Sequence, residues 1–407
     1  MVKKILVING GSSSFKYQVL EKETERRLCQ GLVERIGAAD SMLTHKRFHE
    51  NGETEKFEYP GNYDTHAAGM AKVAEVLMNP ELGGVINDPT EIVVIGHRVL
   101  MGGPDYQEAL VTEEVKQVIR DYIPLGPLHN PANLTGIEAM EKLFPGVPNV
   151  AVFDTGFHAT MPDYAYTYAL PKELTAKYHI RRYGFHGTSH RFVSKAGAAL
   201  LGKKPSEVNV IVCHLGNGSS VSAVRAGKCV DTSMGLTPLQ GLVMGTRCGD
   251  IDPAIVPFLM KNEGLSCDEV DTLMNKKSGF LGLCGKSDSR DIEAGVNAGD
   301  PDCILTFNTQ CYSVKKYIGA YMAALGHVDL IAFAGGIGEN AAPVRAKILE
   351  NLEEFGIELD PELNGVRRGD PHFISKEGSR VKVAVIPTDE ELEIARISVG
   401  IAEGADA

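Results

Sequence analysis

Residues 5–20 read Ile-Leu-Val-Ile-Asn-Gly-Gly-Ser-Ser-Ser-Phe-Lys-Tyr-Gln-Val-Leu, and the expected architecture follows from them. Two apolar, β-branched runs flank a Gly/Ser turn, which is typical of a strand, a turn and a second strand. Ser12, Ser14 and Lys16 alternate on one face of the hairpin. Hydroxyls, backbone N–H groups and an ammonium on a tight turn suit a phosphate group. A surface hairpin explains the same residues equally well.

The same pattern recurs later in the chain. Residues 209–224 again place an apolar strand before a Gly/Ser turn and a second strand, and residues 330–340 run a strand into a glycine turn and a helix. A helix N-terminus after such a turn is itself an anion site. Three glycine turns on strand ends, two of them hairpins in opposite halves, predict a duplicated fold that holds a polyphosphate between its halves.

Composition limits the function classes. A chain of 407 residues is long enough for two domains, and a net charge of −12 argues against nucleic acid or an acidic membrane surface as a partner. The eight cysteines include no CxxC pair, so neither zinc nor a disulfide framework is expected. Free thiols fit a reducing compartment. With no apolar run as long as a membrane span, these features predict a cytoplasmic protein.

Apolar periodicity predicts the remaining elements, with a domain boundary near residue 155. The expected strands are 43–48, 55–59, 91–95, 149–153 and 381–386. The expected helices are 65–79, 112–122, a helix between Pro131 and Leu143, a helix to about Leu201, then 253–263, 268–275, 302–325, 341–354 and a terminal helix. The Gly-rich stretch 231–253 is too long for an ordinary connection, so we expect it to be functional.

Strand ends supply candidate site residues. Asp154 directly follows the strand 149–153 and Arg98 closely follows 91–95, where open α/β sheets bind ligands. Asp154 could hold Mg²⁺ or orient a nucleophile, or it could form a turn or a helix cap. Arg98 and Arg247 lie in Gly-rich turns and could bind a carboxylate or a phosphoryl group, although a surface ion pair is the alternative for each.

For three histidines and one glutamate, the sequence is compatible with either a functional or a structural role. His186 could donate to a developing oxyanion or could be structural, and the same ambiguity holds for His129 and His214. Glu390 could bind Mg²⁺, or it could be a first-turn acid stabilised by the helix dipole.

Taken together, these segments resemble the acetokinase family, a branch of the actin-like, sugar-kinase and heat-shock-protein ATPase superfamily. The resemblance covers nearly the whole chain and is carried by residues 9–16, 154–162, 182–190, 214–218, 244–253 and 336–340. It implies an α/β, duplicated actin-like ATPase (ribonuclease H-like) fold with two domains and a central cleft. The first domain would be 1–155, with a helix at 390–407 packing back on it. The second, at 156–389, would bind the nucleotide.

The family resemblance also implies a reaction, in which the γ-phosphoryl group of ATP moves directly and in line to acetate, giving acetyl phosphate and ADP. Mg²⁺, or Mn²⁺ in its place, would be held by Asn9 and Glu390. Arg98 would bind the carboxylate, Asp154 would be the catalytic acidic residue, and His186 and Arg247 would stabilise the transition state. The methyl pocket would be Leu100, Leu128, Phe185 and Pro238. The nucleotide site would be Lys16, His214, Leu215, Gly216, Asn217, Gly218, Asp288, Ser289, Arg290, Gly336, Ile337, Gly338, Glu339 and Asn340.

The family resemblance further implies a homodimer with small-molecule substrates and with neither nucleic acid nor membrane as a partner. Two other classes compete with this enzyme. A non-catalytic ATP switch of the actin or heat-shock-protein type would not phosphorylate a small acid. A sugar-kinase-like transcriptional regulator needs a basic DNA-binding module, which the sequence does not display.

Overall fold

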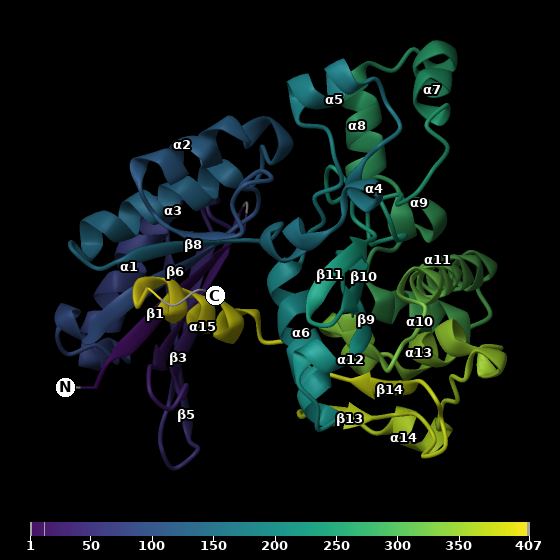
Figure 1. Ribbon diagram of the computed structural model, residues 1–407. Coiled ribbons are helices and arrows are strands. Elements are labelled where there is room, and N and C mark those ends of the chain that lie inside the picture. Colours follow the sequence, from purple (N-terminus) through teal and green to yellow (C-terminus); the bar gives the residue numbers. More distant parts are fainter. Residues whose placement is uncertain (1, 12, 405–407) are drawn as a thin grey trace. The chain divides into compact units, whose positions relative to one another are not determined.

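The computed structural model describes residues 2–11 and 13–404 (Figure 1), so Ser12 of the first glycine turn lies outside the described residues. The chain divides into two compact units. Unit 1 comprises Met1–Gly156 and Asp389–Ala407, and unit 2 comprises Phe157–Thr388. Each unit contains one β-sheet. In the described part of the chain, no helix combines the length and the apolar character needed to cross a membrane.

Unit 1 is built on an eight-stranded sheet in the order β5-β4-β3-β2-β1-β6-β8-β7. Strand β1 pairs in parallel with β6, and β6 with β8, whereas the other neighbours are antiparallel. The strands are β1 (Lys4–Gly10), β2 (Phe15–Glu21), β3 (Arg27–Glu34), β4 (Ser41–Phe48), β5 (Thr54–Gly61), β6 (Ile92–Val99), β7 (Glu108–Leu110) and β8 (Asn149–Phe153). The helices are α1 (His66–Met78), α2 (Glu113–Asp121), α3 (Asn130–Leu143) and α15 (Glu390–Ala402).

Alternating side chains of β1 cover both faces of this sheet. Leu6 and Ile8 belong to the core that holds the buried residues of α1. Ile5 and Val7 belong to the opposite core, which contains Ile394 of α15. Figure 1 shows α15 running beside β1 and β6, with α1 and α3 on the other side of the sheet. The central strand is therefore buried on both faces, which explains its nearly continuous apolar sequence.

Unit 2 contains a six-stranded sheet in the order β11-β10-β9-β12-β14-β13. Its strands are β9 (Asn209–Leu215), β10 (Ser219–Arg225), β11 (Lys228–Thr232), β12 (Leu330–Ala334), β13 (His372–Phe373) and β14 (Lys382–Val385). Its helices are α4 (Asp163–Tyr166), α5 (Lys172–Tyr178), α6 (Gly187–Leu200), α7 (Ile255–Glu263), α8 (Cys267–Lys276), α9 (Gly279–Cys284), α10 (Ser289–Asn297), α11 (Pro301–Leu325), α12 (Gly335–Asn340), α13 (Ala342–Leu349) and α14 (Pro361–Gly365). Helix α6 packs on one face of the sheet, and α11 and α13 pack on the other.

The two sheets repeat one topology, which confirms the predicted duplication. Six strands of unit 1, β3-β2-β1-β6-β8-β7, correspond in order to all six strands of the unit 2 sheet. The pairing senses also agree, because each unit has an antiparallel hairpin beside two parallel pairs and an antiparallel edge strand. Unit 1 differs by adding β4 and β5 at one edge.

Most predicted elements are confirmed, and four boundaries are wrong. Helix α15 ends at Ala402, before the end of the predicted helix 390–407. Strand β6 continues to Val99, so Arg98 lies inside the strand instead of after it. Helix α13 ends at Leu349, because Asn351 has a positive φ of 60° that breaks the helix. Strand β11 extends to Thr232, into the stretch expected to be irregular.

A glycine in β6 sets how closely α15 packs on the sheet. A β-carbon on Gly96 would lie 2.4 Å from Ser398 Oγ and 2.7 Å from Ile394 Cγ2. We expect Gly96→Ala to lower the free energy of unfolding by about 1–3 kcal/mol through overpacking, measured by denaturant titration. Gly319→Ala is the matched control, because nothing lies within 4 Å of a β-carbon there on α11. Equal stability of the two variants would contradict this packing argument.

Candidate active site

Three predicted site residues form a row across neighbouring strands of unit 1. Asn9 of β1 is paired in register with Lys16 of β2 on one side and with Arg98 of β6 on the other. Residues paired in this way project from the same face of a sheet. That face is the one covered by α15, and Asn9 Nδ2 donates to Glu391 Oε1 of this helix at 2.9 Å. The row therefore faces the acidic N-terminus of α15.

Arg98 is held in a fixed orientation by Asp154. Its Nε donates to Asp154 Oδ1 at 2.8 Å and its Nη2 to Oδ2 at 2.5 Å, while Nη1 donates to Asn9 Oδ1 at 3.2 Å. The Asp154 side chain is completely buried. Burial alone would lower the pKa of Arg98, but the adjacent Asp154 carboxylate outweighs it and raises that pKa above its ordinary value. Both oxygens of Asp154 are thus used to orient the guanidinium.

Glu390 opens α15 next to this pair. Burial raises its pKa to about 7, the neighbouring carboxylates of Asp154 and Glu391 add to the effect, and Arg98 opposes it. The carboxylate of Asp389, one residue earlier, makes contacts away from this pair. It caps α15 by accepting from Leu392 N at 3.0 Å and forms a 2.8 Å ion pair with Arg27.

The oxygen atoms in this region fit a hard divalent cation. No cluster of three or more His, Cys, Asp or Glu side chains suited to a metal occurs in residues 2–11 and 13–404. Mg²⁺, however, is typically bound through one or two carboxylates and several waters. Asn9 and Glu390 carry oxygen atoms of that kind near Asp154 and Glu391. Burial, and to a lesser degree the neighbouring carboxylates, raises the pKa of Glu390, and a bound cation would favour its ionised form.

The predicted methyl-pocket residues of unit 1 differ in their surroundings. Leu100 is buried, and its backbone N–H donates to Asn133 Oδ1 at 3.1 Å. Leu100 Cδ2 lies close to Gly126, where a β-carbon would approach it to 3.1 Å. Leu128 is 56% exposed. Leu100 is therefore the leucine held in place by packing.

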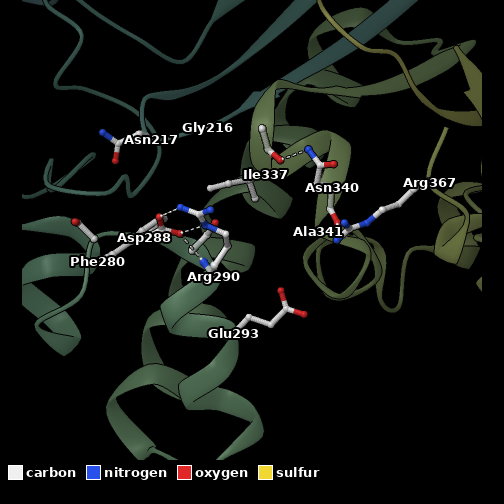
Figure 2. A pocket seen from close by; sticks show the side chains of 13 residues that line it. Gly216, Asn217, Phe280, Asp288, Arg290, Glu293, Ile337, Asn340, Ala341 and Arg367 are labelled. Carbon is white, nitrogen blue, oxygen red and sulfur yellow. Dashed lines mark hydrogen bonds and ion pairs between the residues drawn. The ribbon is translucent and has the colours of Figure 1, made fainter. Parts of the chain in front are cut away.

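Unit 2 contains a cavity of about 660 Å³, within the usual range for small-molecule sites (Figure 2). Eight of the predicted nucleotide-site residues line it: Gly216, Asn217, Asp288, Ser289, Arg290, Gly336, Ile337 and Asn340. Five others line it as well: Phe280, Ser287, Glu293, Ala341 and Arg367. A β-carbon on Gly336 would meet nothing within 4 Å, so the backbone is open to the cavity there.

Polar contacts shape the walls of the cavity. Asp288 caps α10 by accepting from Arg290 N at 2.9 Å, and it forms two side-chain bonds with the Arg290 guanidinium (Figure 2). These bonds lower the pKa of Asp288 to about 2. On the facing helix α12, Asn340 Nδ2 donates to Gly336 O at 2.9 Å. Glu339 points elsewhere, because its Oε1 accepts from the backbone N–H groups of Gly335 and Thr388.

Six residues of the predicted nucleotide site are not among the described lining residues of this cavity: Lys16, His214, Leu215, Gly218, Gly338 and Glu339. Two of them lie next to the predicted transition-state groups. The His214 ring lies 4.5 Å from the His186 ring, centroid to centroid. A β-carbon on Gly218 would approach His186 Nε2 to 3.4 Å and Arg247 Nη1 to 3.5 Å. His186 and Arg247 therefore converge on the space beside Gly218.

The backbone and charge of these two residues are unusual. His186 has a positive φ of 58°, a conformation that costs energy for a residue with a β-carbon and that often marks functional sites. Arg247 donates to Pro238 O at 3.2 Å, and no ion pair joins it to a carboxylate in the described residues. Burial lowers the pKa of Arg247. A guanidinium in that state favours an anionic ligand.

A model of the Acetokinase family matches residues 4–396. The chain belongs to the acetokinase family. This confirms the resemblance drawn from the sequence motifs, and with it the actin-like α/β fold class. Acetate kinase of Oleidesulfovibrio alaskensis is 57% identical over 401 residues, which are 98% of this chain and 100% of that protein. Acetate kinase of Nitratidesulfovibrio vulgaris strain Hildenborough is 55% identical, with the same coverage.

Solved structures of acetokinase-family proteins share the backbone. Acetate kinase of Porphyromonas gingivalis superimposes with a TM-score of 0.91 at 44% identity, covering 98% of this chain and 99% of that one. A propionate kinase from Francisella tularensis gives a TM-score of 0.90 at 40% identity, covering 98% and 100%.

Five residues that line the cavity were not predicted, although the sequence holds a local signal for three of them. Ser287 and Ala341 adjoin the predicted segments 288–290 and 336–340. Glu293 lies four residues after Ser289, one turn along the same face of α10. Phe280 and Arg367 are distant in sequence from every motif, and only the fold brings them to the cavity.

The raised pKa of Glu390 has a consequence for stability. The folded protein keeps this proton up to about pH 7, whereas the unfolded chain releases it near 4.5. Stability must therefore fall as pH rises through that window. We expect Glu390→Gln to gain stability relative to the wild type between about pH 5 and pH 8 in the absence of divalent cations, measured by denaturant unfolding. The exposed Glu81→Gln is the control, and parallel pH profiles for wild type and Glu390→Gln would refute the assignment.

Proposed function

We propose that the protein catalyses reversible transfer of the γ-phosphoryl group of ATP to acetate, giving acetyl phosphate and ADP. The observation that carries this proposal is the 57% and 55% identity to two acetate kinases, each covered over its full length. The most useful experiment is hydroxylamine trapping of acyl phosphate, with a panel of short carboxylic acids and nucleotides. Absence of acyl phosphate with acetate and ATP would refute the proposal.

Similarity of the backbone alone does not indicate that acetate is the preferred substrate. An acetate kinase and a propionate kinase superimpose on this chain almost equally, with TM-scores of 0.91 and 0.90. Fold similarity therefore does not separate the two acids. The sequence relatives at 55–57% identity named above are acetate kinases, and buried Leu100 supplies a physical reason for preferring the smaller acid.

Arg98 is proposed to bind the carboxylate of acetate. A guanidinium has five N–H groups, and three of those on Arg98 are used by Asp154 and Asn9. Two remain, one on each terminal nitrogen, and a carboxylate can accept from both. Asp154 would then act by fixing the guanidinium. Acetate needs no strong general base, because model carboxyl pKa values of about 4 leave it ionised at neutral pH.

His186 and Arg247 are proposed to stabilise the phosphoryl group in the transition state of its transfer. Phosphoryl transfer spreads negative charge over the equatorial oxygens, with the attacking and leaving oxygens in line. Donors already aimed at such charge contribute roughly 3–4 kcal/mol each by the oxyanion-hole precedent. Asn9 and Glu390 would hold Mg²⁺, which supplies charge neutralisation at the phosphates. The residues lining the unit 2 cavity would bind the rest of the nucleotide.

A cytoplasmic homodimer completes the proposal. The cytoplasmic location is supported by the eight free cysteines, which suit a reducing compartment. The dimer is supported by the family resemblance alone, and sedimentation equilibrium would test it directly.

Loss of either arginine tests the charge assignments. We expect Arg98→Ala and Arg247→Ala each to lower kcat/KM by at least about a hundredfold, measured with saturating Mg²⁺. Two arginines outside the proposed site serve as matched controls. Arg120 pairs with Glu138 at 3.2 Å in unit 1, and Arg225 donates to Ala324 O at 2.7 Å in unit 2. Activity of the Arg98 and Arg247 variants within a few-fold of the wild type would remove these assignments.

Substitution of Leu100 tests the proposed preference for acetate over propionate. One methylene in an apolar pocket discriminates by about 10–200-fold, so we expect acetate to be preferred to propionate by about tenfold or more in kcat/KM. Leu100→Ala should shrink this ratio, mainly by lowering KM for propionate. Leu110→Ala, which truncates an exposed leucine, should leave it unchanged. An unaltered ratio in Leu100→Ala would eliminate Leu100 as the determinant.

A further inference from the structure

Ser220 of β10 joins two histidines of unit 2. Its Oγ lies 2.8 Å from His186 Nδ1 and 2.7 Å from His190 Nε2. Ser220 and His190 are both completely buried. A hydroxyl carries one proton and two acceptor lone pairs, so a buried hydroxyl that accepts from one ring can donate its proton to the other. The direction of the two hydrogen bonds therefore decides where both rings carry their protons.

The environment of His190 fixes that direction. Burial lowers its pKa well below the ordinary value, and His158 and His214 nearby reinforce the effect, so the ring is neutral with a single N–H. Within residues 2–11 and 13–404, nothing forms a hydrogen bond with His190 Nδ1. A buried N–H without an acceptor is rarer than an unfilled acceptor. The proton of His190 thus lies on Nε2 and is donated to Ser220 Oγ.

His186 Nδ1, at 2.8 Å, is then within reach as the acceptor for the proton of the Ser220 hydroxyl. A neutral His186 accepting there carries its proton on Nε2. Nε2 is the nitrogen that faces the space beside Gly218, opposite Arg247 Nη1. The chain of hydrogen bonds from His190 through Ser220 therefore presents an N–H donor where the phosphoryl group is proposed to lie.

We propose that Ser220 is a positioning residue that holds His186 as the Nε2–H tautomer for donation to the transferring phosphoryl group. The catalytic part of this proposal rests on the proposed function. Without the hydroxyl, a neutral His186 would distribute its proton between both nitrogens. His190, His214 and Arg247 are titratable or charged groups that lie near His186.

The tautomer can be measured without any activity assay. In protein labelled with nitrogen-15 histidine at about pH 8, where an unperturbed imidazole is neutral, we expect the His186 signals of the wild type to show protonated Nε2. Ser220→Ala should show a mixture of tautomers. The control is Ser222→Ala on the same strand, because buried Ser222 bonds Thr232 Oγ1 at 2.9 Å instead of a histidine. The signals are assigned by their loss in His186→Asn.

Kinetics supply a readout that a purely structural role would not move. We expect Ser220→Ala to lower kcat by about tenfold to a hundredfold at pH 8, the usual effect of losing an orienting partner. KM for ATP and for acetate should change less than about threefold, because Ser220 acts on the transition state. Ser220→Thr keeps the hydroxyl and should retain most of the activity.

The measured tautomer and kinetics each test the positioning role of Ser220. An Nδ1–H tautomer of His186 in the wild type overturns the proposal even if Ser220→Ala does not fold. An unchanged tautomer in Ser220→Ala, or a kcat of Ser220→Ala equal to that of the wild type, also overturns it. A wild type that holds the Nε2–H tautomer but forms no acyl phosphate refutes the proposed function and leaves the tautomer assignment standing.

Discussion

The fully buried carboxylate of Asp154 needs a partner, and Arg98 supplies it. Taking either charge out of water costs several kcal/mol, and removing one partner of such a pair typically costs about 3–5 kcal/mol. The pair therefore ties the end of β8 to the end of β6, and through Asn9 to β1. The N-terminus of α15 closes the group through Glu391. A single electrostatic requirement thus fixes three strands and one helix at the same point.

The duplicated sheet is put to different uses in the two units. In unit 1 the central strands carry charged and amide side chains on the face covered by α15. In unit 2 the equivalent strand β9 carries His214, whose neighbours are hydroxyls and other histidines. One topology therefore supports a charged cluster in one unit and a network of histidines and hydroxyls in the other. We propose that the histidine network positions protons, whereas the charged cluster binds ions.

Local patterns explain what the sequence could predict. The hairpins at 5–20 and 209–224, and the strand ends at Asp154 and Gly336, were predictable because glycine turns and apolar runs act over a few residues. Contacts between distant segments were not predictable in the same way. The orientation of Arg98 depends on a partner 56 residues away, and Phe280 and Arg367 reach the cavity only through the folded chain. The role inferred for Ser220 depends on an unfilled nitrogen of His190, which no sequence pattern reveals.

The packing of α15 on unit 1 also affects the order in which the two units can complete their folding during translation. The helix follows the whole of unit 2 along the chain, yet its Ile394, Ala395 and Ile397 complete a core built from strands made at the start. While unit 2 emerges from the ribosome, the apolar face of β1 and β6 has no helix to cover it. Unit 2 has all of its strands in one uninterrupted segment and can fold first. The nascent N-terminal sheet consequently exposes one apolar face until α15 is translated.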